Sequence, residues 1–153
     1  MKIEYRTGNL FEDSSVKNVA HCCNAQGRMG SGFAKELRAR NPSVYEAYHN
    51  AFDAWGLILG SVIDAEGEDG RFYLNIIGQQ NFGYDGRRYV SYDALANAFE
   101  TISLRYEDKI DHLAMPLIGA GLAGGKWSVI ASIIESHLTV QPIVYLLDGK
   151  IPE

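Results

Sequence analysis

The sequence predicts an α/β protein in which a mixed sheet lies between helices on both of its faces. Short apolar runs typical of strands alternate along the chain with stretches whose apolar residues recur at the helical period. No repeat, linker or low-complexity segment divides the 153 residues. We therefore expect residues 1–153 to form a single domain, which is long enough to bury a full hydrophobic core.

The expected elements follow one another in an order that interleaves strands and helices. Pro42 suits the first turn of a helix, where its missing N–H has no partner to lose, and Ser91 suits a helix N-cap. An acidic turn at residues 66–70 separates two apolar runs, which we expect to be a hairpin or neighbouring strands. The expected strands cover residues 2–6, 16–23, 57–63, 72–77, 112–115 and 140–147, and the expected helices cover 31–40, 42–55, 91–106 and 127–137.

Composition and charge limit the classes of partner. The formal net charge is -5 at pH 7, which argues against bulk binding to nucleic acid or to an anionic membrane surface. No apolar run approaches the length of a membrane span. The two cysteines, Cys22 and Cys23, are adjacent, so a structural disulfide is not expected and neither has the spacing of a metal site. We expect a cytoplasmic, monomeric protein without metal or cofactor.

Two glycine-rich junctions, at residues 24–32 and 116–125, each follow a predicted strand and precede a predicted helix. Such loops meet beyond the C-terminal ends of strands in an open α/β sheet, and their backbone N–H groups can converge on a phosphate. Neither loop matches a Walker motif or a full dinucleotide fingerprint. The alternative is that the glycines only end the strands. We favour a pyrophosphate site, in which backbone dipoles supply most of the attraction.

Three segments carry a specific resemblance: TGNL at residues 7–10, HCCNAQGRMGSGFA at 21–34 and MPLIGAGLAGGKW at 115–127. In this order they resemble the macro domain, a module that binds ADP-ribose. The resemblance implies a three-layer α/β/α fold with a mixed, six-stranded sheet and ADP-ribose along its strand ends. The ligand-binding residues that it implies are Gly8, Asn9, Leu10, Asn24, Met29, Gly30, Ser31, Gly32, Phe33, Ile118, Gly119, Ala120, Gly121, Leu122 and Ala123.

The branch within this family decides the expected activity. Most macro domains have an aspartate where this chain has Asn9, and Asn9 with the HCCN segment is most similar to the ADP-ribose-1″-phosphate phosphatases. A second branch hydrolyses ADP-ribosyl esters on protein or nucleic acid, using a lysine and an aspartate. The matching positions here hold Gln79 or Gln80, and Ala123, which put that mechanism in doubt. A non-catalytic reader of ADP-ribose is the third possibility.

For the phosphatase, the expected catalytic residues are His21, Asn24 and Asp85. Asn24 matches an asparagine that holds the distal ribose, and an amide offers both a donor and an acceptor to the ribose hydroxyls. His21 could activate a water or protonate the leaving group, and Asp85 could act as a base. The structural alternatives are a hydrogen-bonded core histidine, an Asx-turn asparagine and a turn aspartate. Phe82 and Tyr84 either cover the distal ribose or pack their own loop.

Overall fold

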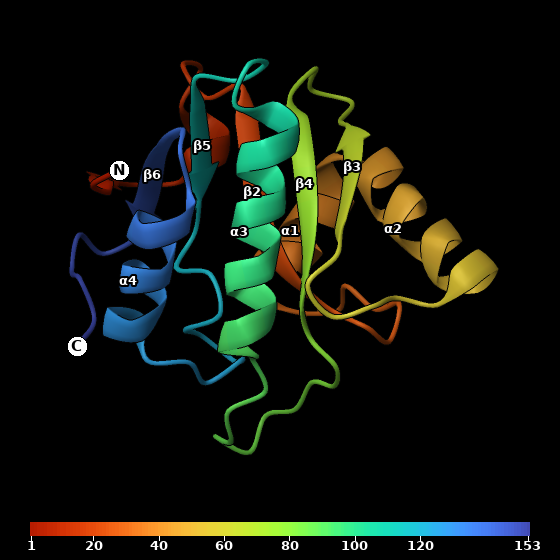
Figure 1. The fold of residues 1–153 in the computed structure, drawn as a ribbon. Coiled ribbons are helices and arrows are strands. Elements are labelled where there is room, and N and C mark those ends of the chain that lie inside the picture. The colour runs from red at the N-terminus through yellow and green to blue at the C-terminus, as the bar shows by residue number, and fades with distance from the viewer.

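The computed structural model describes residues 1–153 and consists of one six-stranded sheet with helices on both faces (Figure 1). The strands lie in the order β1-β6-β5-β2-β4-β3, and all neighbouring strands are parallel except β3 and β4. The strands are β1 (Glu4–Thr7), β2 (Asn18–Asn24), β3 (Val62–Glu66), β4 (Phe72–Gln79), β5 (His112–Met115) and β6 (Gln141–Leu146). The predicted fold class and the β3–β4 hairpin are confirmed.

The helices are α1 (Gly32–Arg40) and α2 (Pro42–Trp55) on one face of the sheet, and α3 (Tyr92–Tyr106) and α4 (Trp127–His137) on the other (Figure 1). A short 3-10 helix, η1 (Leu10–Glu12), follows β1. Pro42 stands in the first turn of α2, and the Ser91 hydroxyl accepts a hydrogen bond from the Ala94 N–H at 3.1 Å, as their residue types predict. No helix is long and apolar enough to cross a bilayer.

The alternating side chains of β2 separate the core into two layers. Ala20 packs into the larger cluster, which α3 and α4 cover, whereas Val19 packs with Leu37 of α1 and Val44 of α2. Because helices cover both faces, β2 is buried nearly throughout its length. Its C-terminal end, at Asn24, is therefore held from both sides.

The prediction of a strand over residues 57–63 is wrong, because β3 begins at Val62. Gly56 and Gly60 adopt positive φ angles of 73° and 86°, which lead the chain through a turn instead of an extended run. Ile58 is 74% exposed there. The apolar residues 57–59 resemble a strand in composition, but the two glycines prevent one from forming.

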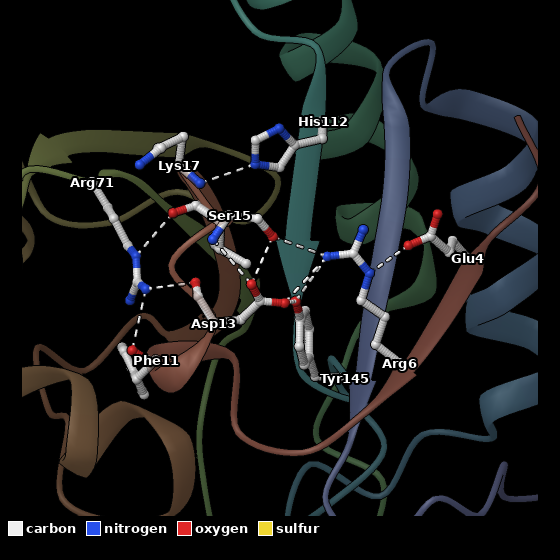
Figure 2. A network of polar contacts seen from close by, with 10 residues as sticks. Glu4, Arg6, Phe11, Asp13, Ser15, Lys17, Arg71, His112 and Tyr145 are labelled. Atoms are coloured by element: carbon white, nitrogen blue, oxygen red, sulfur yellow. Dashed lines mark hydrogen bonds and ion pairs between the residues drawn. The ribbon is translucent and has the colours of Figure 1, made fainter.

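The segment from η1 to the start of β2 is held by Arg71, which directly precedes β4 (Figure 2). Its guanidinium donates to the backbone carbonyls of Phe11, Asp13 and Val16 at 3.2, 3.0 and 3.0 Å. The side chain of Arg71 is only 11% exposed. One guanidinium thus satisfies three carbonyl groups of a segment that makes few other backbone hydrogen bonds.

A second group of polar contacts ties the same segment to β1 and β6 (Figure 2). The Nη1 atom of Arg6 lies 3.2 Å from Asp13 Oδ2, from Ser15 Oγ and from Tyr145 Oη, and the Tyr145 hydroxyl also donates to Asp13. The Ser15 hydroxyl donates to Asp13 Oδ1 at 2.6 Å, and this bond, followed by that of Tyr145, holds the pKa of Asp13 well below its usual range. Asp13 is therefore ionised at neutral pH and balances Arg6.

These contacts fix the position of Phe11, whose ring stacks on Phe33 at 5.0 Å between centroids and 12° between planes. Phe33 belongs to the first turn of α1. The polar contacts at β1 and β6 are thereby connected, through one aromatic pair, to the helix start that borders the glycine-rich loop.

We predict that Arg71→Met lowers the free energy of unfolding by about 3 kcal/mol, because three carbonyls lose a charged donor. Urea unfolding followed by circular dichroism measures this loss. Arg105→Met, at an exposed position of α3, serves as the control and should change stability by less than about 0.5 kcal/mol. Equal effects of the two substitutions would contradict the prediction.

Candidate functional site

A cavity of about 340 Å³ lies at the C-terminal ends of β2, β4 and β5. Loops that follow all three strands border it, and Figure 1 shows these loops meeting at the lower edge of the sheet. In a parallel α/β sheet this edge is where ligands bind. The two glycine-rich junctions of the sequence thus face the same cavity.

The first loop begins with a turn that the side chain of Asn24 holds together. Asn24 Oδ1 accepts hydrogen bonds from the N–H groups of Gln26 and Arg28, at 3.0 and 3.4 Å, and Nδ2 donates to the Arg28 carbonyl at 2.9 Å. The hydroxyl of Tyr48, on α2, lies 2.9 Å from Oδ1 and accepts from the Arg28 N–H at 3.1 Å. One N–H of the Asn24 amide remains for a ligand.

Gly27 is required within this turn. Its φ of 77° lies in the left-handed region, and a Cβ there would lie 2.7 Å from a ring carbon of Phe52. Phe52 therefore supports the turn from below and leaves room only for glycine. The path of the chain toward Arg28 and the glycines that follow is fixed by this contact.

The turn leads into the N-terminus of α1, which points its first N–H groups toward the cavity. Gly32, Phe33 and Ala34 line the cavity, and their N–H groups have no partner within the chain. The side chain of Ser31, the N-cap residue, makes no capping hydrogen bond. This helix start carries the positive end of the helix dipole and is suited to an anion.

The second loop presents a similar set of donors. Gly119, Gly121, Leu122 and Ala123 line the cavity, and none of their N–H groups donates within the chain. The loop is closed by the Gly125 N–H, which donates to the Gly119 carbonyl at 2.7 Å, and the Ala123 carbonyl accepts from Tyr89 N–H at 2.7 Å. The loop is thus braced while its donors stay free, and two sets of N–H groups border one cavity.

Side-chain charge contributes little to this cavity. Arg28 is the only lining residue with a formal charge at neutral pH, and no aspartate, glutamate or lysine lines the walls. The attraction for an anion must therefore come mainly from backbone dipoles, as the acidic composition of the chain led us to expect.

His21 lies in the cavity wall but is 2% exposed. Its Nε2 is 2.5 Å from Asn75 Oδ1, so Nε2 carries the proton and the ring is held beneath Phe33, with 5.6 Å between ring centroids. Burial lowers the pKa of His21 to about 4, and the hydrogen bond to Asn75 offsets only part of that effect. The ring is neutral at physiological pH.

Asp85 lies in the loop between β4 and α3 but not in the cavity lining. Its carboxylate accepts from the Tyr89 hydroxyl at 2.8 Å and pairs with Arg87 at 2.7 Å. These contacts lower the pKa of Asp85, and the hydrogen bond from Tyr89 has the largest effect. Its loop neighbours Phe82, Gly83 and Tyr84 do line the cavity.

The structure brings most of the predicted binding residues together around the cavity. These are Asn24, Met29, Gly30, Ser31, Gly32, Phe33, Ile118, Gly119, Gly121, Leu122 and Ala123. The predicted residues outside its lining are Gly8, Asn9, Leu10 and Ala120. Asn9 caps η1, with Oδ1 accepting from the Phe11 N–H at 3.0 Å, and Leu10 is buried. The roles of all these residues stay predictions.

The cavity also contains residues that sequence reasoning did not assign to the site. Gln79 ends β4 directly beside Asn24, and Cys22 packs against it with 3.8 Å between Sγ and Oε1. Burial raises the pKa of the Cys22 thiol to about 12. Tyr84, which the sequence offered either as a cover for the distal ribose or as loop packing, also lines the cavity, and its hydroxyl donates to Ser31 Oγ at 3.3 Å. Only the strand register, which the sequence does not give, brings Gln79 next to Asn24.

Comparison with known proteins connects this site to a family. No protein-family model matches the sequence. An uncharacterized 17.5 kDa protein of Enterobacteria phage T4 is 32% identical, covering 94% of this chain and 95% of its own. The ADP-ribose 1″-phosphate phosphatase of Meyerozyma guilliermondii is 28% identical over 89% and 94% of the two chains, and an ADP-ribose glycohydrolase of Homo sapiens is 25% identical over 88% and 82%.

Solved structures agree with this relationship. A protein of unknown function from Bacteroides thetaiotaomicron superposes with a TM-score of 0.85 at 31% identity, covering 95% of this chain and 98% of its own. A macrodomain protein from Streptomyces coelicolor superposes with a TM-score of 0.77 at 29% identity, covering 95% and 99%. The chain belongs to the macro domain family.

The buried His21 makes stability depend on pH in a defined window. Since the folded pKa is about 4 and the ordinary value is 6.5, the unfolded state binds more protons between these values. The His21 contribution should therefore reduce the free energy of unfolding by about 3 kcal/mol as the pH falls from 7 to 4. Urea unfolding at several pH values should give a shallower dependence for His21→Gln than for the unsubstituted protein. Parallel curves would contradict the prediction.

Proposed function

We propose that this macro domain binds ADP-ribose and hydrolyses the phosphate ester on its distal ribose, as an ADP-ribose-1″-phosphate phosphatase. The observation that carries the proposal is that two sets of free N–H groups border one cavity, one at the start of α1 and one at Gly119 and residues 121–123. A pyrophosphate has anionic oxygens on both sides and can accept from both sets at once.

The ligand would lie along the strand ends, with its distal ribose near Asn24. The remaining N–H of the Asn24 amide is available to a ribose hydroxyl, while the rest of that amide holds the turn in place. The adenine would extend beyond the cavity toward Asn9, whose Oδ1 keeps a lone pair after accepting from Phe11. The asparagine thereby offers the acceptor that an aspartate offers elsewhere in the family.

The relatives support this activity within a broader class. Yeast relatives at 21–28% identity are named ADP-ribose 1″-phosphate phosphatases, and the human relative is named an ADP-ribose glycohydrolase. Hydrolysis of an ADP-ribose derivative is common to both names. A lysyl adduct is not supported in this chain because Gln79 provides an amide beside Asn24, and no lysine lines the cavity.

In the proposed reaction, water attacks the phosphorus of the terminal phosphate and the bond from phosphorus to the C1″ oxygen breaks. The attacking water gives a proton to a base, the departing C1″ oxygen takes up a proton from solvent, and inorganic phosphate and ADP-ribose are released. We assign that base to Asp85, which is ionised and belongs to a loop whose residues 82–84 line the cavity. His21 would position Phe33 and the helix start rather than exchange a proton, since its ring is buried and bonded to Asn75, and its pKa is lowered to about 4.

The second candidate is a reader that binds ADP-ribose without turnover. It is favoured because the titratable side chains near the cavity already bond to other residues of the chain. His21 is bonded to Asn75, and Asp85 is bonded to Arg87 and Tyr89. Both candidates need the same binding site, and only an assay of turnover separates them.

Gly121→Val tests the binding site. A Cβ at Gly121 meets no protein atom within 4 Å, so the substitution should leave the fold intact and only fill the cavity beside the free N–H groups. We expect calorimetric titration to show ADP-ribose binding by the unsubstituted protein, a weaker affinity for Gly121→Ala and at least roughly tenfold loss for Gly121→Val. Unchanged affinity in a folded Gly121→Val variant would place the ligand elsewhere.

Turnover is tested by release of inorganic phosphate from ADP-ribose-1″-phosphate. We expect Asp85→Asn to lower kcat roughly a hundredfold with little change in the affinity for ADP-ribose, because a general base contributes to the chemical step alone. Glu100→Asn, at an exposed position of α3, is the charge-matched control and should keep full activity. Binding of ADP-ribose without phosphate release would leave the reader as the function.

A further inference from the structure

Arg28 combines a rigid backbone with an unused side chain. Its N–H is held by Tyr48 and Asn24, and its carbonyl accepts from Asn24 Nδ2 at 2.9 Å. Its guanidinium makes no hydrogen bond, ion pair or ring contact, and the residue is exposed at the cavity wall. The backbone contacts do not depend on the identity of this side chain. The turn is therefore built in a way that presents residue 28 to the cavity without using it for the fold.

The neighbouring arginines are occupied by contacts within the chain. Arg87 pairs with Asp85 at 2.7 Å, and Arg88 lies over the ring of Tyr92 at 4.4 Å. Arg38, on α1, lies over the Tyr45 ring at 3.7 Å. None of these arginines lines the cavity. Arg28 thus carries the only formal positive charge in the cavity lining. No acidic side chain lines the cavity to pair with it.

The position of Arg28 decides which part of a ligand it meets. It is bonded through its backbone to Asn24, the residue that the proposed function assigns to the distal ribose. The pyrophosphate donors belong to the start of α1 and to residues 119–123, which follow further along the first loop and in the second loop. A cation beside Asn24 is therefore suited to a group attached to the distal ribose.

We propose that Arg28 determines specificity by favouring ligands that carry an anionic group on the distal ribose, a terminal phosphate above all, over the same ligands without it. A guanidinium matches the geometry of phosphate oxygens with two parallel N–H donors, which a lysine does not. The inference rests on the proposed binding of ADP-ribose. It does not need the phosphatase activity, since it concerns affinity for the terminal group.

The test compares ADP-ribose and ADP-ribose-1″-phosphate as ligands of the unsubstituted protein, Arg28→Gln and Arg28→Lys. Titration calorimetry gives both affinities, and KM replaces the affinity for the phosphorylated ligand if it is turned over. We expect the unsubstituted protein to prefer the phosphorylated ligand roughly tenfold, and Arg28→Gln to lose that preference while binding ADP-ribose with less than about threefold change. Arg28→Lys should keep part of the preference, and high salt should reduce it.

Arg105→Gln is the matched control, because it makes the same change of net charge at an exposed position of α3. It should keep the full preference, and thermal unfolding should show that every variant is folded. No binding of ADP-ribose by the unsubstituted protein would refute the proposed function itself. With ADP-ribose bound, the inference is overturned if Arg28→Gln weakens both ligands equally, which would place Arg28 on the pyrophosphate, or if it weakens neither.

Discussion

The turn at residues 24–28 depends on one side-chain amide. Asn24 bonds to two N–H groups and one carbonyl of its own turn, and the Tyr48 hydroxyl connects this amide to α2. This amide and the contact of Gly27 with Phe52 together set the path of the chain toward Arg28, the glycines at residues 30 and 32, and the start of α1. The resemblance to macro domains predicted a ribose contact for Asn24, and the structure shows the turn-forming role that was the alternative. In the proposed complex the same amide would serve both roles.

The other half of the site depends on packing rather than on a side-chain amide. Gly119 and Gly125 approach the Val90 and Ile130 side chains so closely that a Cβ at either position would lie 2.9 Å or less from an atom of Val90. The second loop is thus shaped by contact with α4 and with the segment before α3, both of which lie on the opposite face of the sheet from α1 and α2. The cavity forms where these two independently supported loops meet.

Much of this architecture could be predicted from the sequence, because local signals were strong. Pro42, Ser91 and the glycines mark helix starts, and the strands β4 and β5 stand out as apolar runs. The strand predicted at residues 57–63 was wrong because composition does not reveal that Gly56 and Gly60 take positive φ angles. The side to which His21 points was also undetermined, since alternation along β2 gives two faces but not which one α1 covers.

The residues of the cavity that were missed share a physical reason. Gln79 and Cys22 meet only because β4 pairs with β2 in one register. Tyr84 was considered for the site, but its contact with Ser31, 53 positions away in the chain, was not foreseen. Such contacts are set by tertiary structure, and no local pattern predicts them. The glycine-rich loops could be found from the sequence because their positive φ angles and close backbone contacts require glycine.

The contrast between the acidic chain and its anion-binding loops has a kinetic consequence. Backbone dipoles act only at short range, whereas the net charge of -5 acts over a Debye length and repels an approaching anion. Encounter with an anionic nucleotide is then slowed at low ionic strength, and salt accelerates it. The residence time of the bound molecule is governed by the N–H groups and not by the long-range field. For the proposed nucleotide ligand, we therefore expect affinity to come from slow release rather than from fast capture.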